Sequence, residues 1–285
     1  MRLTVLGCGS SSGVPSVSGF WGQCDKSDPK NYRTRMCVAL HTDDDEVWLI
    51  DAGTDIRAQL IREGITRVHG VFLTHSHADH ILGLDDLRSI FARWREPIPV
   101  YGDKHTLAHV DKVFGYLIDK ESKAPPRIPS YQPFLRLNPL EFQPADVYQT
   151  WCKTKGESPL CPNIFNLTTA FSWKGQEVKA FFQDHGGSHS LGYRFGDFAY
   201  STDVKNLSDQ AFQMLKGVKT WLVDCISDKP SHTHAHLPQT LEWIRRVNPE
   251  KAVLIHMSAH LDFKTLAAQL PRSVVPAYDG LVIDL

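Results

Sequence analysis

A chain of 285 residues with 42% apolar and 22% charged residues has the size and composition of a globular protein with a sizeable buried core. The net charge of −1 gives no broad basic surface, which argues against binding to extended nucleic acid or to an anionic membrane. No run of about 18 apolar residues is present, and the first residues lack the apolar segment of a signal peptide, so we expect neither membrane spanning nor secretion. The six cysteines show no pairing pattern, which favours reduced thiols and a cytoplasmic location. Fourteen histidines are the compositional anomaly, and metal binding is a natural role for them.

The predicted elements alternate between short apolar runs and amphipathic segments. Apolar runs predict strands at residues 3–6, 37–41, 47–50, 71–73, 98–101, 178–182, 191–195, 198–201, 220–223, 252–255 and 281–285. Helical periodicity predicts helices at residues 54–63, 84–94, 106–118, 208–216, 238–247 and 263–270. Because no linker separates these elements, we expect one layered α/β domain over residues 1–285. Residues 138–169 are rich in proline and polar side chains and too long for an ordinary connection, which indicates a lid or a contact in a homodimer.

Candidate metal ligands follow five of the predicted strands. They are Asp51 after 47–50, the group His75, His77, Asp79 and His80 after 71–73, His185 after 178–182, Asp203 after 198–201, and His256 after 252–255. In layered α/β proteins, binding sites gather where strands release the chain into loops, so we expect these side chains to meet. His185 is preferred to His189 because it directly follows the strand and Asp184. The other single histidines are interpreted as solvated or core residues: His41, His69, His105 and His109.

The densest group is the segment Thr74-His75-Ser76-His77-Ala78-Asp79-His80. A His-x-His pair at the end of a strand can direct two nitrogens at one cation, while Asp79 and His80 on the following turn can serve a second cation. Imidazole suits zinc, iron and manganese, and carboxylates bridge cations and offset their charge. Because the set contains no thiolate, it favours a catalytic centre open to water and substrate over a closed structural zinc site.

This segment, preceded by Leu49-Ile50-Asp51-Ala52-Gly53, resembles the metallo-β-lactamase superfamily. The resemblance implies a four-layered αβ/βα sandwich with a dinuclear site along one edge. Residues 6–15, LGCGSSSGVP, are similar to the opening of the phosphoribosyl cyclic phosphodiesterases of the carbon–phosphorus lyase pathway and of the tRNA 3′-end processing endonucleases. His80 stands where true β-lactamases typically have cysteine, and His77 where flavodiiron oxygen reductases have glutamate, so both of those branches are disfavoured.

Two features depart from these relatives. The cyclic phosphodiesterases carry an N-terminal cysteine cluster that forms a structural zinc site, whereas only Cys24 lies in the corresponding stretch, residues 21–24. The sequence also shows no long basic arm of the kind with which the endonucleases grip tRNA. We therefore expect no structural zinc site of that kind, and a small substrate in place of extended RNA.

The resemblance implies a role for each candidate residue. The first metal is expected on His75, His77 and His185, the second on Asp79, His80 and His256, and Asp203 is expected to bridge the two. Asp51 is expected to support a ligand histidine from behind. The two divalent ions are zinc or manganese, a hydroxide held between them is the expected nucleophile, and Asp79 also counts among the catalytic residues.

A second histidine-rich segment, Ser231-His232-Thr233-His234-Ala235-His236, precedes the predicted helix 238–247. It matches a loop that carries the general acid in the cyclic phosphodiesterases, which implies His234 as that acid and His232 as a helper that binds phosphate. The alternative is a solvated helix entry with no catalytic role. The loop of residues 9–13 is likewise open between phosphate binding through backbone N–H groups and a tight turn under the site.

These features predict a dinuclear metal-dependent phosphodiesterase acting on a small cyclic or nucleotide-like ester. A thioester or lactone hydrolase uses the same ligand set and is the main alternative. An RNA-processing endonuclease is a further one, if a partner subunit supplies the RNA grip. A catalytically inactive binding module is least favoured, because degenerate relatives tend to lose these ligands.

Overall fold

The computed structural model describes residues 1–119, 132–153 and 162–285, and it arranges their strands in two seven-stranded sheets. In spatial order the first sheet contains β14 (Leu281–Asp284), β1 (Arg2–Gly7), β2 (Cys37–His41), β3 (Val47–Ile50), β4 (Gly70–Phe72), β5 (Ile98–Gly102) and β6 (Leu135–Pro139). The second contains β13 (Val274–Pro276), β12 (Lys251–Ile255), β11 (Thr220–Asp224), β10 (Phe198–Ser201), β9 (His189–Phe195), β8 (Gln176–Asp184) and β7 (Thr168–Trp173).

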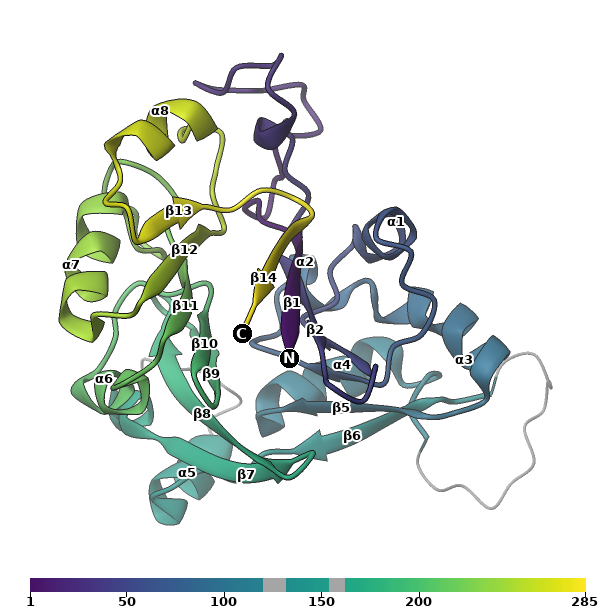
Figure 1. Ribbon diagram of the computed structural model, residues 1–285. Coiled ribbons are helices and arrows are strands. Elements are labelled where there is room, and N and C mark those ends of the chain that lie inside the picture. The colour runs from purple at the N-terminus through teal and green to yellow at the C-terminus, as the bar shows by residue number, and fades with distance from the viewer. Residues whose placement is uncertain (120–131, 154–161) are drawn as a thin grey trace.

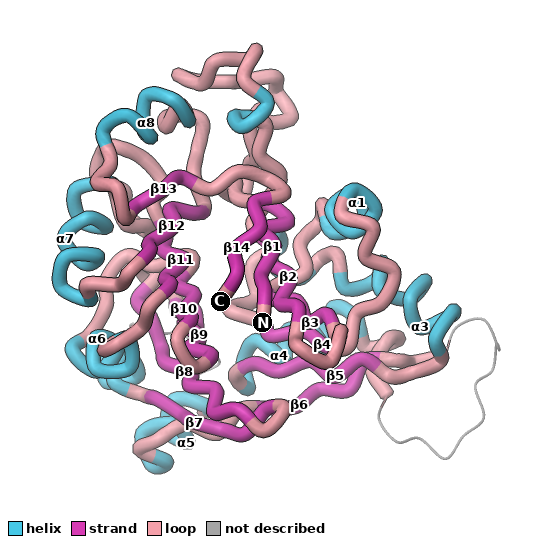
Figure 2. Tube along the Cα trace, in the orientation of Figure 1, coloured by secondary structure: helices cyan, strands magenta, loops and turns pink. Residues whose placement is uncertain are grey.

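Helices cover the outer faces of the two sheets. Those that follow strands of the first sheet are α1 (Ile56–Arg62), α2 (Ala78–Ile81), α3 (Arg88–Trp94) and α4 (Lys104–Phe114). The later helices are α5 (Ala145–Cys152), α6 (Asp209–Leu215), α7 (Leu237–Val247) and α8 (Phe263–Gln269). Figure 1 shows α1 and α3 outside the first sheet and α6 and α7 outside the second, and Figure 2 shows the strands between these helices. The predicted four-layered αβ/βα sandwich is confirmed.

The two layers of core follow from the alternation of side chains along the strands. In β2, Val38 and Leu40 pack into the core between the sheets, whereas Cys37 and Ala39 pack under the helices outside the first sheet. Both faces of this strand are buried, which explains why its sequence is a continuous apolar run.

Phe72, the last residue of β4, ties the two sheets together directly before the histidine-rich segment. Its ring centroid lies 5.6 Å from that of Tyr193 and 5.2 Å from that of Phe195, both on β9. The Tyr193 hydroxyl donates a hydrogen bond of 2.7 Å to the Leu73 carbonyl, and the Leu191 N–H donates one of 2.9 Å to the Thr74 carbonyl. These contacts hold residues 73 and 74 against the second sheet, so the segment that follows starts from a fixed position.

Most predicted elements are present, and the strands that sequence analysis missed lie at sheet edges. They are β6, β7 and β13, which occupy three of the four edge positions. An edge strand has one neighbour instead of two and tolerates polar residues and proline, as at Asn138 and Pro139 of β6. The predicted helix 84–94 is divided into a 3₁₀ turn, Leu84–Leu87, and α3.

The segment 138–169, predicted as a lid or dimer contact, contains regular structure in its described part. It includes the end of β6, helix α5, the 3₁₀ helix Pro162–Asn166 and the start of β7, while residues 154–161 lie outside the described residues. Tyr148 and Trp151 of α5 are buried in the core between the sheets, and Trp151 packs edge-on against Phe182, with ring centroids 5.0 Å apart. Helix α5 is therefore part of the packed core. A role as a lid or dimer contact stays a prediction for the rest of the segment.

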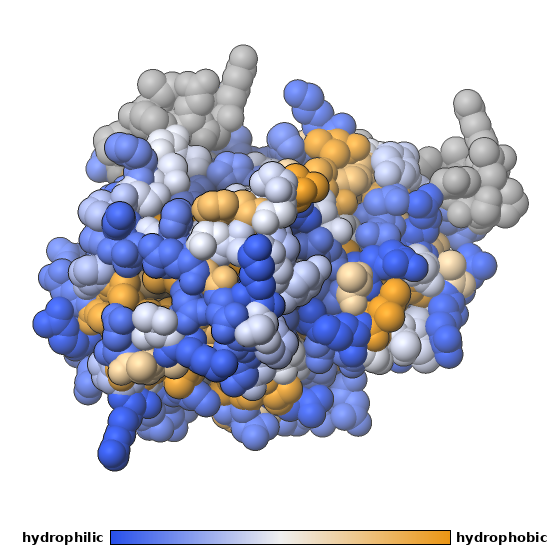
Figure 3. Space-filling view, turned by 90° about the horizontal axis from the view of Figure 1, so that it is seen from above, coloured by the Kyte–Doolittle hydropathy of each residue, from blue (hydrophilic) through white to orange (hydrophobic). Residues whose placement is uncertain are grey.

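None of the helices in the described ranges is long and apolar enough to cross a membrane. The face drawn in Figure 3 is mainly hydrophilic, with its hydrophobic side chains in separate groups.

Candidate metal centre

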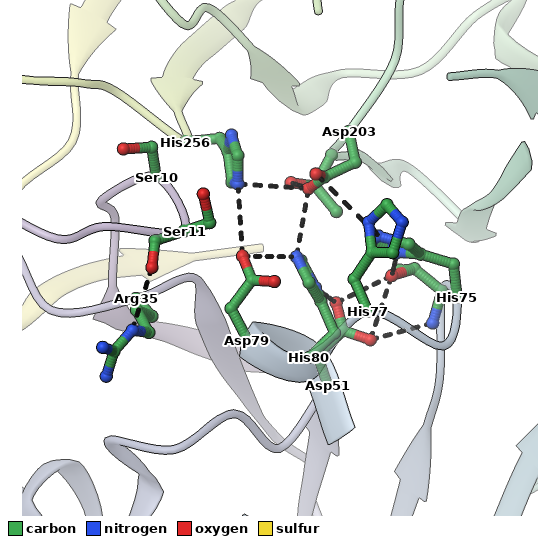
Figure 4. Close-up of polar contacts among 12 residues, drawn as sticks. Ser10, Ser11, Arg35, Asp51, His75, His77, Asp79, His80, Asp203 and His256 are labelled. Carbon is green, nitrogen blue, oxygen red and sulfur yellow. Dashed lines mark hydrogen bonds and ion pairs between the residues drawn. The ribbon is translucent and has the colours of Figure 1, made fainter. Parts of the chain in front are cut away.

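Three of the predicted site residues adopt the left-handed backbone conformation, which residues other than glycine rarely do. The φ angle is 65° at Asp51, 50° at Asp203 and 57° at His256. These residues follow the ends of β3, β10 and β12, so each strand turns sharply as it leaves its sheet. Such a conformation costs about 1–2 kcal/mol for an L-residue and persists where the surrounding structure enforces it, often at functional sites. Figure 4 shows that the turns bring the three side chains into one cluster.

The short helix α2 carries Asp79 and His80 and lies directly against the loop after β3. The Ala52 N–H donates to the His80 carbonyl at 2.8 Å, and the Gly83 N–H donates to the Ala52 carbonyl at 2.8 Å. A Cβ at Gly53 would stand 1.8 Å from the Asp79 carbonyl oxygen, so only glycine allows this approach. The sequence Asp51-Ala52-Gly53 therefore sets the distance between Asp51 and the residues of α2.

The Asp203 carboxylate lies at the centre of the cluster, and its two oxygens face different histidines (Figure 4). Oδ2 is 3.2 Å from Nε2 of His80 and 3.3 Å from Nε2 of His256. Oδ1 is 3.6 Å from Nε2 of His185 and 3.9 Å from Nε2 of His75. Each oxygen of this carboxylate therefore faces a different pair of histidines.

The described residues form three groups of ligand atoms at this carboxylate, and the third, Asp203, His234 and His256, shares members with the other two. The first consists of His75, His77, His185 and Asp203, and the second of Asp79, His80 and His256. In the first, Nε2 of His75 and Nδ1 of His77 lie 2.8 Å apart, so two imidazoles point at one place. In the second, Asp79 Oδ2 is 3.4 Å from Nε2 of His80. The structure thus brings together all seven predicted ligand residues.

The donor set fits divalent cations on the chemistry of its own atoms. Nε2 of His80 and Nε2 of His256 are buried and have no hydrogen-bond partner among the described residues. A buried polar atom without a partner is costly, and a cation between these nitrogens and the carboxylates removes that cost. Imidazole nitrogen and carboxylate oxygen are ligands that zinc and manganese both accept.

The pKa shifts favour the protonation states that bind metal. Burial and the neighbouring His80 place the pKa of His75 well below its usual value, and burial likewise lowers the pKa of His185, so both rings are neutral. Although burial opposes its ionisation, the His256 and His80 imidazoles hold the pKa of Asp203 well below its usual range. His80 differs, because the Asp203 and Asp51 carboxylates outweigh burial and raise its pKa well above the usual value. A cation that binds at His80 must displace a proton, so affinity at this position rises with pH.

The outer nitrogens of three candidate ligands are held by hydrogen bonds from behind. Nδ1 of His80 is 2.7 Å from Asp51 Oδ2, and the same carboxylate accepts the Thr74 N–H at 2.8 Å. Nδ1 of His75 is 2.9 Å from the Thr74 hydroxyl, and Nδ1 of His185 is 2.8 Å from the Thr233 carbonyl. Such contacts fix which nitrogen faces the metal and how the ring is turned. Asp51 lies behind His80, the place that sequence analysis assigns to a supporting carboxylate.

His234 reaches the centre from the loop between β11 and α7. Its Nε2 is 3.9 Å from Asp203 Oδ1, and its ring stacks on that of His256 with centroids 4.8 Å apart. Its Nδ1 is 2.9 Å from Asp224 Oδ2. Although burial opposes the charged form, the Asp224 carboxylate raises the pKa of His234 to about 9.

Asp224 is a functional candidate that sequence analysis missed. It is fully buried at the end of β11, where its carboxylate also accepts the Val204 N–H at 2.9 Å. The signal that identifies the other candidates is present here too, because Asp224 directly follows the apolar run of residues 220–223. The position of Asp224 explains why His234, which is distant in sequence from the candidate ligands, is held at the centre.

The remaining histidines near the centre take other positions. His232 is exposed at the surface, and no hydrogen bond or ion pair of its side chain occurs among the described residues. Its backbone carbonyl packs against Gly186, where an added Cβ would lie 2.3 Å from it. His189, which sequence analysis ranks below His185, lies apart from both ligand groups, and its Nε2 is 3.4 Å from Asp103 Oδ2.

The loop of residues 9–13 packs beside the centre. The Ser10 N–H donates to the Met257 carbonyl at 3.2 Å, next to His256, and Figure 4 shows Ser10 and Ser11 near His256 and Asp79. A Cβ at Gly9 would stand 2.9 Å from the Thr34 carbonyl oxygen. The loop is thus a tight turn that also borders the site.

The region around Cys24 contains a buried arginine. The Arg33 guanidinium donates to the Leu261 carbonyl at 2.6 Å and to the Ser258 carbonyl at 3.0 Å. It also donates to the Asn31 side chain at 3.1 Å. Hydrogen bonds from this side chain therefore join the N-terminal loop to the segment that follows His256.

Comparison with known proteins places these observations in a family. A family model described as a beta-lactamase superfamily domain matches residues 47–257, the stretch that contains Asp51 and all seven candidate ligands. The chain is 29% identical to the octanoyltransferase of Porphyromonas gingivalis over 288 residues, which cover 100% of this chain and 52% of that protein. It is 29% identical to ribonuclease Z of Methanococcus maripaludis over 119 residues, which cover 40% of this chain and 33% of that protein. The chain thus spans about half of the first relative and aligns with about a third of the second.

A solved structure resembles the whole chain. The crystal structure of a diphosphatase from the PhnP family has a TM-score of 0.81 and 29% sequence identity, and the match covers 100% of this chain and 97% of that one. The domain match, this full-length likeness and the ligand clusters agree with one another. The chain therefore belongs to the beta-lactamase superfamily and is a metal-dependent hydrolase of its metallo-β-lactamase branch.

Proposed function

We propose that the protein hydrolyses a small cyclic or nucleotide-like phosphodiester. The observation that carries the proposal is the pairing of a carboxylate-centred ligand cluster with His234, an imidazole that Asp224 holds 3.9 Å from the central carboxylate. Hydrolysis of a phosphodiester requires charge neutralisation at the phosphate and a proton for the departing alkoxide. The cluster and His234 meet these two requirements separately.

The ligand assignment follows the first two groups of atoms. We assign His75, His77 and His185 to one divalent cation, Asp79, His80 and His256 to the other, and Asp203 to both. When bound, two divalent ions of zinc or manganese neutralise phosphate oxygens and lower the pKa of water toward about 7. Asp79 uses Oδ2 toward His80, which leaves its other oxygen to accept a hydrogen bond from the attacking water. Asp51 keeps the His80 ring in place through its contact with Nδ1.

His234 acts as the general acid. With a pKa of about 9 its ring carries a proton at neutral pH, and the Asp224 carboxylate at Nδ1 directs Nε2 toward the centre. A ribose or similar alkoxide is a poor leaving group and needs a proton as it departs, whereas an aryl oxide does not. Asp224 is a positioning residue, since it acts through His234.

Two relatives support phosphorus chemistry. The full-length structural likeness is to a diphosphatase, and a shorter stretch resembles ribonuclease Z. The net charge of −1 and the lack of a basic arm favour a small substrate in solution over extended RNA or a membrane. A cytoplasmic location and a homodimer belong to the same proposal, and fractionation of cells and light scattering of purified protein test them.

Acyl ester or thioester hydrolysis is the second candidate. The observation that favours it is the alignment of the whole chain with an octanoyltransferase, a protein whose name implies acyl chemistry. The chain covers 52% of that protein, so the name can equally describe the part that the chain does not match.

A substrate panel separates the two candidates. Protein reconstituted with zinc or with manganese is assayed with a cyclic ribose phosphate, bis(p-nitrophenyl) phosphate, an octanoyl thioester and a tRNA precursor. We expect kcat/KM for the phosphate esters to exceed that for the thioester at least about 100-fold, a difference of about 2.7 kcal/mol in transition-state stabilisation. Asp203→Asn is the inactive control. If the wild type instead prefers the thioester and the control hydrolyses none of the substrates, thioester hydrolysis is the function and the phosphodiester proposal is wrong.

A further inference from the structure

Three polar side chains lie in the core behind Asp203, and the proposed reaction uses none of them. Gln183 is on β8, Ser190 is on β9, and Thr202 directly follows β10, three strands that Figure 1 shows next to one another. All three side chains are fully buried. We call them the buried polar cluster. Because a buried polar group is costly unless it is hydrogen-bonded, the hydrogen bonds of this cluster show which part of the structure it holds.

The hydrogen bonds of the buried polar cluster converge on Asp203. The Ser190 hydroxyl donates to the Asp203 carbonyl at 2.9 Å. The Gln183 amide donates to the Ser190 hydroxyl at 3.0 Å and to the Thr202 carbonyl at 3.2 Å. The Thr202 hydroxyl donates to Oδ2 of Asp203 at 2.8 Å. The backbone of Asp203 and one of its carboxylate oxygens are therefore held in place by buried side chains.

The peptide group between Asp203 and Val204 is held at both ends. Ser190 donates to its carbonyl oxygen, and Asp224 Oδ2 accepts its N–H at 2.9 Å. Asp203 has a φ angle of 50°, a conformation that costs about 1–2 kcal/mol for an L-residue and persists only where its surroundings enforce it. Because the orientation of this peptide group sets the ψ angle of Asp203, the two hydrogen bonds hold the residue in its left-handed conformation.

The same cluster joins Asp203 to the hairpin that carries His185. Gln183 and Ser190 are paired in register on β8 and β9, and His185 lies in the loop between these two strands. Oδ1 of Asp203 is 3.6 Å from Nε2 of His185. The hydrogen bonds between the hairpin and the turn at Asp203 help to set this distance. Ser190 therefore acts on the geometry of the centre through the backbone of Asp203.

We propose that Ser190 is a positioning residue for the metal pair. Its hydroxyl keeps Asp203 in the left-handed conformation, in which the two carboxylate oxygens face different pairs of histidines. Without this hydrogen bond the turn relaxes toward ordinary backbone conformations, and the carboxylate serves two cations less well. The inference rests on one part of the proposed function, the assignment of Asp203 to both cations, and does not depend on the substrate.

The test measures metal binding by Ser190→Ala, which removes the hydroxyl and leaves the Cβ. Competition between the manganese-loaded full chain and a chelator gives the metal affinity, which should be about 10–100-fold lower than in the wild type, as when other hydrogen-bond partners of metal ligands are removed. Electron paramagnetic resonance of the manganese-loaded protein should show weaker magnetic coupling, because the coupling between two ions depends on the groups that bridge them. Neither measurement requires turnover.

Ser201→Ala is the matched control. Ser201 is equally buried at the end of β10, and its hydroxyl accepts the Trp221 N–H at 3.1 Å. This variant should lose stability in thermal denaturation and retain metal affinity and coupling. Equal affinity and coupling in Ser190→Ala and Ser201→Ala would overturn the inference. Gln183→Met removes the amide that donates to Ser190 and should show the same selective loss of metal, and it decides the test if Ser190→Ala does not fold.

The wild type tests the proposed function separately. If it holds two coupled ions but hydrolyses no phosphodiester, the proposed reaction is wrong, and a selective loss of metal in Ser190→Ala still supports the positioning role. If it holds a single ion, the assignment of Asp203 to two cations is wrong. Ser190 then positions one ion if Ser190→Ala binds it at least about 10-fold more weakly than Ser201→Ala does, and the inference is wrong if the two variants bind it equally.

Discussion

Asp224→Asn isolates the effect of one carboxylate on the protonation of His234. Asparagine has nearly the same shape, and its amide oxygen can still accept the Val204 N–H that Asp224 accepts at 2.9 Å. It can also accept the proton on Nδ1 of His234. The fold at the end of β11 is therefore preserved while the negative charge is lost.

The expected loss of rate depends on pH in a way that follows from the pKa of His234. With a pKa of about 9, about nine-tenths of His234 is protonated at pH 8, whereas at the ordinary value of 6.5 only about 3% would be. A reaction that needs this proton should slow about 30-fold at pH 8 and less than two-fold at pH 6. Burial lowers the pKa of the variant further and enlarges the loss. Bound cations lower the pKa in both proteins and move the range to lower pH, but the loss still grows as pH rises.

The assay is a profile of kcat/KM between pH 6 and 9 for two esters. A cyclic ribose phosphate has an alkoxide leaving group and should show the full pH-dependent loss, while bis(p-nitrophenyl) phosphate should show little. Asp228→Asn makes the same chemical change at an exposed aspartate of the same loop and should follow the wild type. A loss that is equal for the two esters, or that does not vary with pH, would refute the assignment of His234 as the general acid and Asp224 as its support.

Three further predictions concern the metal ions, the acid and the backbone of the site. Elemental analysis should find two zinc or manganese ions per chain. Asp203→Ala should lower the occupancy of both metal positions, and His256→Ala mainly that of one position. A single tightly held ion in active protein would contradict the dinuclear assignment. His234→Ala should retain both metals and slow the cyclic ribose phosphate about 10²–10⁴-fold with a much smaller effect on the aryl ester, and equal losses would indicate phosphate binding in place of proton donation. Gly53→Ala should lower the free energy of unfolding by about 1–3 kcal/mol in thermal denaturation and reduce metal content, because the added Cβ would lie 1.8 Å from the backbone of α2. Gly102→Ala, where the nearest contact of the added Cβ is 3.5 Å, is the control. Equal behaviour of the two variants would contradict a positioning role for the contact at Gly53.

The sequence by itself determined the interior strands and the order of the ligands. Strands such as β2 and β12 are buried on both faces and therefore appear as continuous apolar runs. The residue that follows such a run lies where the strand ends and the chain enters a loop. Asp51 and His256 could therefore be recognised as candidate site residues without a structure. The spacing of the group at residues 75–80 is local, since it lies within one turn and a short helix.

The edge strands and α5 were beyond the same reasoning. Edge strands such as β6 and β13 have one partner and short, mixed sequences, so their pairing depends on a neighbour that is distant in sequence. Helix α5 has eight residues, of which only Tyr148 and Trp151 are fully buried, and this is too few for a helical period to stand out.

Only the tertiary structure decided which polar groups act on one another. In the sequence, Asp224 resembles any aspartate at the end of a strand. Its role can be recognised only in the structure, where Nδ1 of His234, ten residues later, lies 2.9 Å from its Oδ2. Lys112 of α4 and His189 of β9 likewise line one recess, although they lie far apart in the sequence. The physical reason is that a hydrogen bond or an ionic contact acts over a few ångströms, and side chains distant along the chain come within that range only when the two sheets pack together.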